Sequence, residues 1–444
     1  MALNSITPDA VAAAATHAKV AARPESRHSL VAVRVVILLA ALLAAGFYLQ
    51  ASSRVYRAFR WAEDGTPENL RTAAQLEPGN AEFRYRSGRY SLLVQDFPDA
   101  IAEFRAAIAL NSHDARYWLD LASADLATGD SSGTQQALAR ALEADPTTPE
   151  VVWQTANYDL VQGNTEAALR RFHELIEHDS DSLQAVLNVC WRATRDPDLI
   201  AEKVLPARPD AYFALIRFLW NKRPPDAATK VWPHLIALKQ PFPVQLAFPY
   251  FDYLIGREDF AQLTEAWAQL AIFNSEFRPY VPTDNQIVNG GFELDLLNGG
   301  LDWRYSARGG ASVIVDINRA HSGNRSLAIT FEGAPEDSGV FQLVPVRANT
   351  RYQFSGFMMA EDLETISPPR FSVLGLRGNK PYLLTDGVTS SPGWQELQGE
   401  FTTGPEDDLL LVRIVRVPGQ RLIRGRIWVD DVKLTPEPST GAMP

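Results

Sequence analysis

The sequence of 444 residues predicts a multidomain chain with a single N-terminal transmembrane helix, an all-α solenoid and a C-terminal all-β sandwich of the jelly-roll kind. Three observations predict these parts. One long apolar run lies near the N-terminus, a repeat with a period of 34 residues follows it, and the C-terminal part alternates between apolar and polar residues. At about 150 residues per domain, the chain is long enough for several domains.

Composition excludes several classes of protein. Apolar residues make up 46% of the chain and charged residues 21%, as in packed globular proteins, so a disordered chain is excluded. The 42 basic residues are outnumbered by 53 acidic ones, which gives a net charge of −11, and we therefore expect no nucleic-acid partner. Cys190 is the only cysteine, so neither an internal disulfide nor a cysteine-based zinc site can form.

The apolar run covers residues 30–50 and contains one charged residue, Arg34. A helix of this length spans ~30 Å, the thickness of the hydrocarbon core of a bilayer, and Arg34 lies close enough to one end to reach the headgroups. We therefore predict a single-pass membrane anchor after a disordered tail at 1–29. The alternative is a cleaved signal peptide, whose apolar core is typically only about 7–15 residues long and follows a short basic start.

The 34-residue period is clearest in the small residues Gly88, Ala122 and Ala156. Two further columns keep the same phase: Leu70, Phe104, Leu138 and Phe172, and Ala73, Ala107, Ala141 and Leu175. Small residues at helix crossings, an aromatic knob and a proline near the end of a unit resemble the tetratricopeptide repeat (TPR). The resemblance covers three full units, at 81–114, 115–148 and 149–182, and the second helix of an earlier unit at 66–77.

From 183 to 273 the phase is lost, but apolar residues keep the spacing of amphipathic helices at 210–221, 226–239 and 259–273. We therefore expect one TPR-like α-solenoid over 51–273. The resemblance implies a concave groove that holds a protein partner. The first-helix residues expected to face it are Tyr85, Leu119 and Trp153 in one row and Arg89, Ser123 and Asn157 in another. The alternative is a rigid spacer whose groove is only solvated.

Prolines mark a linker at 274–287, after which apolar and polar residues alternate. Eight strands are expected, at 312–317, 326–331, 339–346, 352–360, 370–376, 394–402, 409–417 and 426–434. Gly, Pro, Asn and Asp fill the gaps, and no helical pattern lies between the strands. We therefore expect an antiparallel sandwich over 288–435 and a disordered tail at 436–444.

Five segments of this C-terminal part indicate a particular protein family more specifically than the alternation of apolar and polar residues does. They are NGGFE at 289–293, HSGNRSL at 321–327, NTRYQFSGFMMAE at 349–361, GWQELQGEFTTG at 393–404 and IWVDDVKL at 427–434. Together they resemble carbohydrate-binding modules of the family 4/9 type, which are galactose-binding-like jelly rolls. The resemblance implies a carbohydrate ligand. The aromatic residues that could stack on sugar rings are Trp303, Tyr305, Phe357, Tyr382 and Trp394, and each is also a candidate for the core.

The same resemblance implies a structural calcium ion, held by the acidic residue of the opening segment and an aspartate of the closing strand. The matching positions are Glu293 and Asp430 or Asp431. Hard oxygen ligands from both ends of the domain suit Ca²⁺, and the ion would tie the first strand to the last. The alternative is a set of solvated carboxylates at the edge of the sheet.

The sequence contains no pattern that indicates catalysis. His173 and His178 lie five residues apart, whereas the HExxH zinc motif needs its histidines four apart on one helix face. A phosphate-binding loop, a G-x-S-x-G elbow and a dinucleotide-binding turn are also missing from the sequence. We therefore expect a protein that is not an enzyme.

These parts together predict a membrane-anchored adaptor, whose solenoid binds a protein and whose sandwich binds carbohydrate in the assembly or export of a surface polysaccharide. We expect the C-terminal domains to be extracytoplasmic (periplasmic) because of the sugar-binding module, since basic residues flank both ends of the apolar run almost equally. One alternative is a protein-interaction scaffold whose sandwich binds protein rather than sugar. The other is an accessory factor of a sugar-processing enzyme encoded elsewhere.

Overall fold

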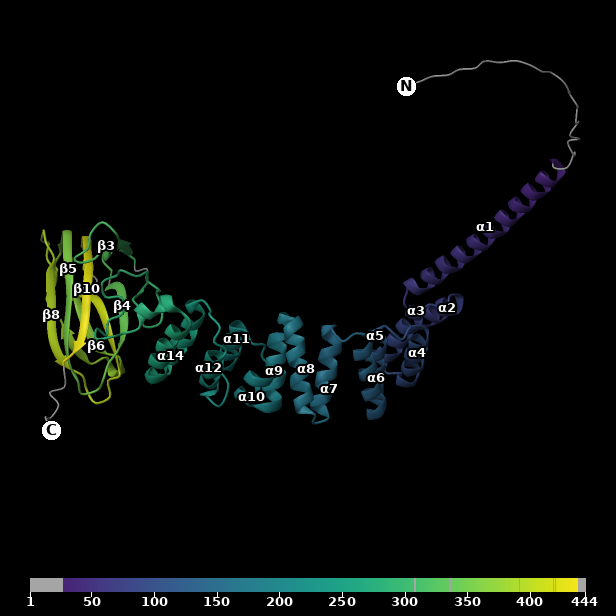
Figure 1. Cartoon of the computed structure of the whole chain (residues 1–444), viewed down its shortest axis with the longest axis horizontal. Helices are drawn as coiled ribbons and strands as arrows, with labels where there is room; N and C mark the ends of the chain where they lie inside the picture. The colour runs from purple at the N-terminus through teal and green to yellow at the C-terminus, as the bar shows by residue number, and fades with distance from the viewer. Residues whose placement is uncertain are drawn as a thin grey trace, which may run out of the picture. The chain divides into compact units, whose positions relative to one another are not determined.

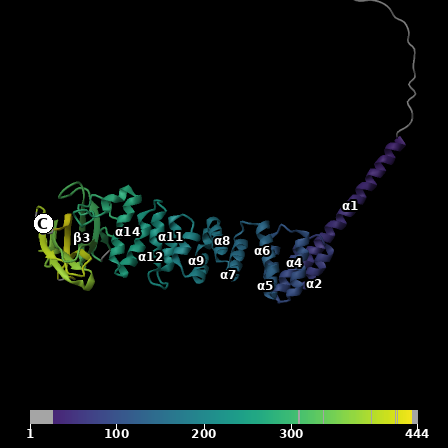
Figure 2. The same cartoon turned by 60° about the horizontal axis from the view of Figure 1, so that its bottom comes forward.

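The computed structural model describes residues 27–306, 309–335, 337–390, 392–417, 419 and 421–437 (Figure 1). Helices come first along the chain and strands last, and the same order is visible in the turned view of Figure 2. The chain divides into two compact units after Gln154, within helix α7 (Pro149–Val161). The first unit contains the start of the helical region, and the second contains the remaining helices and the sandwich.

Helix α1 (Arg27–Glu63) contains the segment that was predicted to span a membrane. Its most apolar window has a mean hydropathy of 2.3, and none of that window is buried. The helix is thus long and apolar enough to cross a membrane, a property that a signal sequence near an N-terminus shares. Of the predicted tail at 1–29, residues 27–29 form the start of α1, and residues 1–26 lie outside the described residues.

The same helix continues beyond the apolar segment because its last turns have a packing partner. Ala58 and Ala62 are fully buried, in one cluster with Leu70 and Ala74 of α2 (Pro67–Leu76). The end of α1 therefore supplies the first helix of the earlier repeat unit, whose second helix was predicted at 66–77. The apolar segment and the first repeat share one unbroken helix.

Three helix pairs match the predicted repeat units. They are α3 (Ala81–Leu93) with α4 (Phe97–Leu110), α5 (Ala115–Thr128) with α6 (Ser131–Ala144), and α7 with α8 (Thr165–His178). Polar turn residues cap the helix starts. The side chains of Asn80 and Asp114 accept the N–H groups of Glu82 and Arg116 at 3.0 and 3.1 Å. The turn residues that separate the repeats therefore also start the helices.

The column of small residues lies where the two helices of a pair cross. Gly88 is so close to Phe104 that a Cβ atom there would come within 2.7 Å of two ring carbons. The equivalent Ala122 and Ala156 are 2% and 0% exposed. Side-chain size in this column therefore limits how closely the paired helices pack, which is why the repeat is visible in the sequence.

Helices continue through the predicted degenerate region. They are α9 (Leu183–Thr194), α10 (Pro197–Lys203), α11 (Pro209–Leu219), α12 (Ala227–Ala237), α13 (Phe248–Gly256) and α14 (Phe260–Phe273). Of these, α11, α12 and α14 were predicted within a few residues of their ends. The others were not predicted individually: α10 and α13 have only 7 and 9 residues, too few to show a clear period, whereas α9 has 12 and no structural feature explains why it was missed.

The segment that was predicted as a linker, 274–287, is ordered. Its residues Ser275–Tyr280 form the 3-10 helix η3, in which Phe277 and Tyr280 are buried. The ring of Phe277 packs edge-on against Trp267 with 4.8 Å between centroids, and the Trp267 indole donates to the Tyr280 carbonyl at 2.8 Å. The change of composition at 274 thus marks a packed connection, since its aromatic residues join a core.

The described strands form two antiparallel sheets. The first has the order β1 (Arg304–Tyr305), β4 (Asp337–Pro345), β9 (Leu409–Arg416), β6 (Pro369–Gly375) and β7 (Pro381–Leu384). The second has the order β2 (Ala311–Asp316), β3 (Ser326–Gly333), β10 (Ile423–Pro436), β5 (Arg351–Thr365) and β8 (Gln395–Thr402). All eight predicted strands are present. Strands β1 and β7 were not predicted because they are too short to show an alternation.

The core of the sandwich lies between the two sheets. Trp303, Tyr352 and Phe354 belong to it, and each is 1% exposed. The opening segment is held against the last strand by its backbone, since the N–H of Val432 donates to the carbonyl of Gly290 at 2.9 Å. A side chain at Gly290 would overlap the Val432 carbonyl, so NGGFE requires a glycine at this position.

Within the second unit, the last helices pack directly on one end of the sandwich. A side chain at Gly300 would overlap the ring of Trp267 on α14. Arg304 Nη1 donates to Asp252 Oδ1 at 2.7 Å, across the same contact. The sandwich is therefore joined to α13 and α14 by side-chain packing as well as by the chain.

Candidate functional site

The outer face of the second sheet carries a small apolar patch. In the strand register, Trp428 of β10 lies opposite Ala328 of β3 and Met359 of β5. These three residues are at most 9% exposed although they are separate from the main core, and Trp394 packs against them. The Trp428 indole donates to Asp316 Oδ2 at 2.8 Å. The patch therefore forms an apolar floor on this face of the sheet, and its one indole N–H at Trp428 has a hydrogen-bond acceptor.

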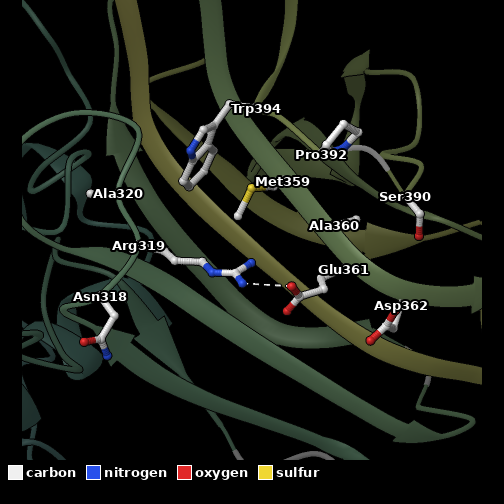
Figure 3. A pocket seen from close by; sticks show the side chains of 10 residues that line it. All are labelled: Asn318, Arg319, Ala320, Met359, Ala360, Glu361, Asp362, Ser390, Pro392 and Trp394. Carbon is white, nitrogen blue, oxygen red and sulfur yellow. Dashed lines mark hydrogen bonds and ion pairs between the residues drawn. The ribbon is translucent and has the colours of Figure 1, made fainter.

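A hollow of about 810 Å³ lies over this patch, lined by residues 318–320, by β5 and by the segment before β8 (Figure 3). Arg319 Nη2 donates to Glu361 Oε1 at 2.8 Å, and the Arg319 guanidinium carbon lies 4.4 Å from the centre of the Trp428 ring. In the view of Figure 3, Trp394 and Asp362 lie at opposite ends of the hollow, with the Arg319–Glu361 pair between them. The lining thus combines apolar surface, one paired cation and two carboxylates.

Two of the predicted sugar-stacking residues come together at this hollow. The His321 ring stacks on Phe357 with centroids 3.7 Å apart and meets Trp394 at 5.7 Å in an edge-to-face arrangement. Phe357 and Trp394 are half-buried, so each keeps part of its ring open to solvent. Of the two, Trp394 lines the hollow itself.

The other three predicted aromatic residues lie elsewhere. Trp303 is 1% exposed, and its indole donates to the Asn289 carbonyl at 3.2 Å, so its ring belongs to the core and a sugar cannot stack on it. Tyr305 is 39% exposed on β1, in the first sheet. Tyr382 lies on β7 of the same sheet, where its hydroxyl bonds to Asp407. Neither tyrosine joins the hollow.

Four residues of the site were not predicted: Arg319, His321, Glu361 and Asp362. His321 and Glu361 lie in HSGNRSL and NTRYQFSGFMMAE, the segments that carried the family resemblance. The alternation of β5 places Glu361 on the same face as Phe357, so strict application of the two-residue period could have found it. Nothing local in the sequence indicates the ion pair between Arg319 and Glu361, which lie 42 residues apart.

The loop at 317–325 is held to the opening segment by one carboxylate. Glu293 Oε1 accepts the N–H groups of Asn324 and Arg325 at 2.8 and 2.9 Å. The Arg325 guanidinium donates back to the Glu293 carbonyl at 3.2 Å. Glu293 is therefore engaged in hydrogen bonds to the loop through both side chain and backbone.

Two further carboxylates hold the same loop to β10. Asp430 Oδ2 accepts the N–H groups of His321 and Ser322 at 2.7 and 3.2 Å, and Asp431 Oδ2 lies 2.6 Å from Nδ1 of His321. Burial raises the pKa of Asp430, although these backbone N–H groups oppose the rise. Burial would also raise the pKa of Asp431, but hydrogen bonds from His321 and Ser322 lower it overall.

The three residues of the expected calcium site converge on Gly291. The Cβ position of Gly291 would lie 3.8 Å from Asp430 Oδ1 and 4.0 Å from both Asp431 Oδ1 and Glu293 Cγ. Within the described part of the chain, however, no three His, Cys, Asp or Glu side chains form a group that could hold a metal ion. A calcium ion here would need backbone carbonyls as further ligands, which Ca²⁺ accepts. Calcium binding stays a prediction.

The predicted groove residues of α3 and α5 differ in exposure. Tyr85 and Leu119 are 5% and 4% exposed, so they pack within the helices and do not face a groove. The Tyr85 ring lies 6.0 Å from that of Phe104 and 4.7 Å from that of Tyr117. Burial raises the pKa of the Tyr85 hydroxyl, and the nearby Asp120 carboxylate adds to the rise.

The remaining groove residues keep some exposure. The Arg89 side chain is 65% exposed and lies 3.6 Å from Asp120, and both residues line a hollow of about 490 Å³ in the first unit. Ser123 is half-buried and donates to the Leu119 carbonyl at 3.0 Å. Trp153 and Asn157 are half-buried on α7. Among the predicted residues, Arg89 is the one that an approaching partner reaches most easily.

Comparison with known proteins identifies two regions of the chain. Residues 284–416 match a family described as a carbohydrate binding domain, and residues 91–154 match the tetratricopeptide repeat. The chain matches no curated protein.

Solved structures resemble one part of the chain each. A carbohydrate-binding module of family 4 is 18% identical over 34% of this chain and 99% of that module, with a TM-score of 0.27. The xylan-binding domain CBM22-1 from Paenibacillus barcinonensis is 20% identical over 33% of this chain and 91% of that domain, with a TM-score of 0.25. A protein named MamA is 15% identical over 43% of this chain and 91% of its own, with a TM-score of 0.27. From the family matches, the chain contains a tetratricopeptide-repeat region followed by a jelly roll of the carbohydrate-binding kind.

Proposed function

We propose that this protein is a membrane-anchored adaptor without catalytic activity, whose solenoid binds a protein and whose jelly roll binds carbohydrate. It acts on the extracytoplasmic, periplasmic side, in the assembly or export of a surface polysaccharide. The repeat and carbohydrate-binding matches support the two binding roles in kind, and the length and apolarity of α1 support the anchor.

The observation that carries the carbohydrate proposal is the composition of the hollow on the second sheet. Sugar rings have apolar C–H faces that pack on aromatic side chains, and their hydroxyl groups need directed polar partners. Trp394 and Met359 offer the apolar surface, and Arg319 and Glu361 offer a donor and an acceptor in a fixed mutual orientation. Asp362 adds a carboxylate at the other end of the hollow.

Binding of defined oligosaccharides tests this proposal. We expect the full chain, in a detergent without a sugar headgroup, to bind at least one member of a panel of neutral and charged oligosaccharides in calorimetric titrations. Trp394→Ala should lower the affinity about tenfold or more, because aromatic stacking contributes on the order of 1–2 kcal/mol. Tyr305→Ala removes an exposed aromatic ring from the other sheet and should leave the affinity unchanged. If no sugar binds, the scaffold alternative is favoured.

The protein-binding role is proposed for the exposed part of the solenoid around Arg89. Its guanidinium faces solvent, so an acidic group of a partner can reach it. The test captures partners with wild-type protein and with a variant carrying Arg89→Glu and Asn157→Arg. An unchanged set of partners contradicts the groove and favours the rigid spacer.

The compartment is tested by a reporter. We expect alkaline phosphatase fused after Glu437 to be active, as it is only outside the cytoplasm, and a fluorescent protein that needs the cytoplasm to fold to stay dark at the same position. The opposite pattern would place the jelly roll inside the cell and remove extracellular polysaccharides as ligands.

A further inference from the structure

The loop at 317–325 contributes one wall of the hollow and is also the segment that the three carboxylates hold. Resting on the carbohydrate-binding function proposed above, we propose that Glu293, Asp430 and Asp431 are positioning residues for sugar binding. They fix the loop so that Arg319 lines the hollow and His321 lies against Trp394 at its edge. The carboxylates themselves do not line it.

The loop depends on these side chains because it has little structure of its own. It joins β2 to β3, and among the described residues no backbone hydrogen bond links one residue of 317–325 to another. Residues 321–324 are exposed to solvent. Without the carboxylates, the amides at 321–325 would therefore lose the hydrogen bonds that hold this part of the loop in place.

The carboxylates replace the missing backbone bonds in two places. Asp430 accepts the N–H groups of His321 and Ser322. On the other side of Gly323, Glu293 accepts the N–H groups of Asn324 and Arg325. Gly323 has a φ of +66°, and a side chain there would overlap the Glu293 carboxylate. The loop therefore fits closely over Glu293 and turns at a residue that only glycine adopts easily.

The residues that these carboxylates hold are only a few positions along the chain from the side chains at the hollow. Arg319 precedes His321 by two residues, and its carbonyl accepts the hydroxyl of Ser326 at 2.6 Å. The His321 ring is held at Nδ1 by Asp431 and lies flat on Phe357. A change at the carboxylates therefore moves the side chains that a sugar would meet.

The buried position of Asp430 makes its bonds hard to replace. Asp430 is 0% exposed, so its hydrogen bonds to the loop form away from water, where they are stronger and where water cannot substitute for a lost partner. Glu293 is exposed and is the better residue for a test, because water can reach the loop amides that its substitution leaves without an acceptor.

The test compares Glu293→Ala with Glu293→Gln, which keeps an acceptor oxygen for the two loop amides. Asp430→Asn is a second variant, and Glu400→Gln is the matched control, an exposed acid of the same sheet that pairs with Arg351 away from the loop. The full chain is used with a chelator present throughout, so that no metal ion contributes. Cellohexaose, xylohexaose and chitohexaose are the probes.

In Glu293→Ala we expect hydrogen exchange of the amides at 321–325 to become at least about tenfold faster, and the affinity for the bound probe to fall about tenfold, since each bond to a charged acceptor is strong. Glu293→Gln should recover most of the affinity, and Glu400→Gln should match wild type in both measurements. Unchanged exchange, or faster exchange with unchanged affinity, overturns the positioning role alone. If wild type binds none of the three probes although its loop amides are protected, the carbohydrate proposal itself fails for these sugars, and the positioning role fails with it.

Discussion

The guanidinium of Arg319 stacks on the indole of Trp428, 4.4 Å from the ring centre, while its Nη2 atom donates to Glu361 at 2.8 Å. A cation on an aromatic face and a carboxylate at its edge together fix the direction of a long side chain. Arg319 therefore presents its remaining N–H groups to the hollow in one orientation. Trp428, at 1% exposure, is the floor on which that orientation depends.

Replacement of Arg319 should affect sugar binding more than stability. The Arg319 and Glu361 side chains are 41% and 47% exposed, and such ion pairs contribute only ~0–1 kcal/mol to the free energy of unfolding. We expect Arg319→Ala to lower the affinity for an oligosaccharide about tenfold, because a charged hydrogen bond is lost. Arg319→Lys should recover little, since it lacks the planar fork.

Calorimetry and thermal unfolding check this expectation together. Arg351→Ala is the control, because Arg351 pairs with Glu400 on the same sheet at similar exposure. Wild-type affinity in Arg319→Ala would show that the hollow is not the sugar site, whereas a large loss of stability would show that Arg319 is structural.

The contact between the last helices and the sandwich contains a buried acid, Asp302. Its side chain is fully buried, Oδ2 accepts the N–H of Leu297 at 2.7 Å, and Oδ1 lacks a hydrogen-bond partner among the described residues. Burial raises the pKa of Asp302 from 3.8 to about 7, although N–H groups of Leu297 and Trp303 oppose the rise. The folded protein therefore binds this proton more tightly than the unfolded chain does.

Because the pKa of this acid is higher in the folded state, its contribution to stability is most favourable below pH 3.8 and decreases as the pH rises from about 3.8 to about 7. The full decrease is on the order of 4 kcal/mol. We expect Asp302→Asn to lose this decrease, so that its free energy of unfolding, relative to that of wild type, rises between about pH 4 and pH 7 and levels off above pH 7. Chemical unfolding at several pH values measures it.

Asp386→Asn, at an exposed acid of the sandwich, is the control for this experiment and should keep the wild-type pH profile. Parallel profiles for wild type and Asp302→Asn would show that the carboxyl group is already ionised or hydrated in the folded protein, which contradicts its assignment as a buried acid.

The stability of the α3–α4 pair should depend on the size of the side chain at position 88, where the chain has Gly88. A methyl group there would come within 2.7 Å of the Phe104 ring, which cannot move without opening the α3–α4 crossing. We expect Gly88→Ala to destabilise the protein by about 1–3 kcal/mol, as overpacking does. Circular dichroism during thermal unfolding measures the loss. Gly79→Ala should have little effect because nothing lies within 4 Å of its Cβ position, and an equally stable Gly88→Ala would show that the crossing is looser than its geometry indicates.

The sequence was most informative where contacts are local. Paired helices repeat a crossing within each unit, so one small residue per period, such as Gly88, Ala122 or Ala156, made the TPR region visible. Strands longer than about five residues showed their alternation, and β1 and β7 did not. Residues 274–287 were predicted to be a linker. The local pattern did not reveal that an aromatic residue of this segment, Phe277, packs on Trp267.

The site was only partly predictable because it is assembled from distant segments. Phe357 and Trp394 were proposed from residue type alone, and the same criterion wrongly selected Trp303. Residue type does not tell which aromatic rings are buried in the core between the two sheets. The contact between Arg319 and Glu361 spans 42 residues, and that between His321 and Asp430 spans 109. Only the folded chain brings these residues together.

Calcium binding by Glu293, Asp430 and Asp431 can be tested directly, because these three acidic residues converge on Gly291. We expect millimolar Ca²⁺ to raise the melting temperature of the chelator-treated protein by several degrees, as ligand binding to the folded state requires. Glu293→Gln should reduce that rise, since it removes one charged ligand, while Glu400→Gln should not. Equal melting temperatures in calcium and in chelator would mean that the hydrogen bonds of Glu293 and Asp430 to the 317–325 loop already satisfy these carboxylates, and that the opening segment and β10 are joined without a metal ion.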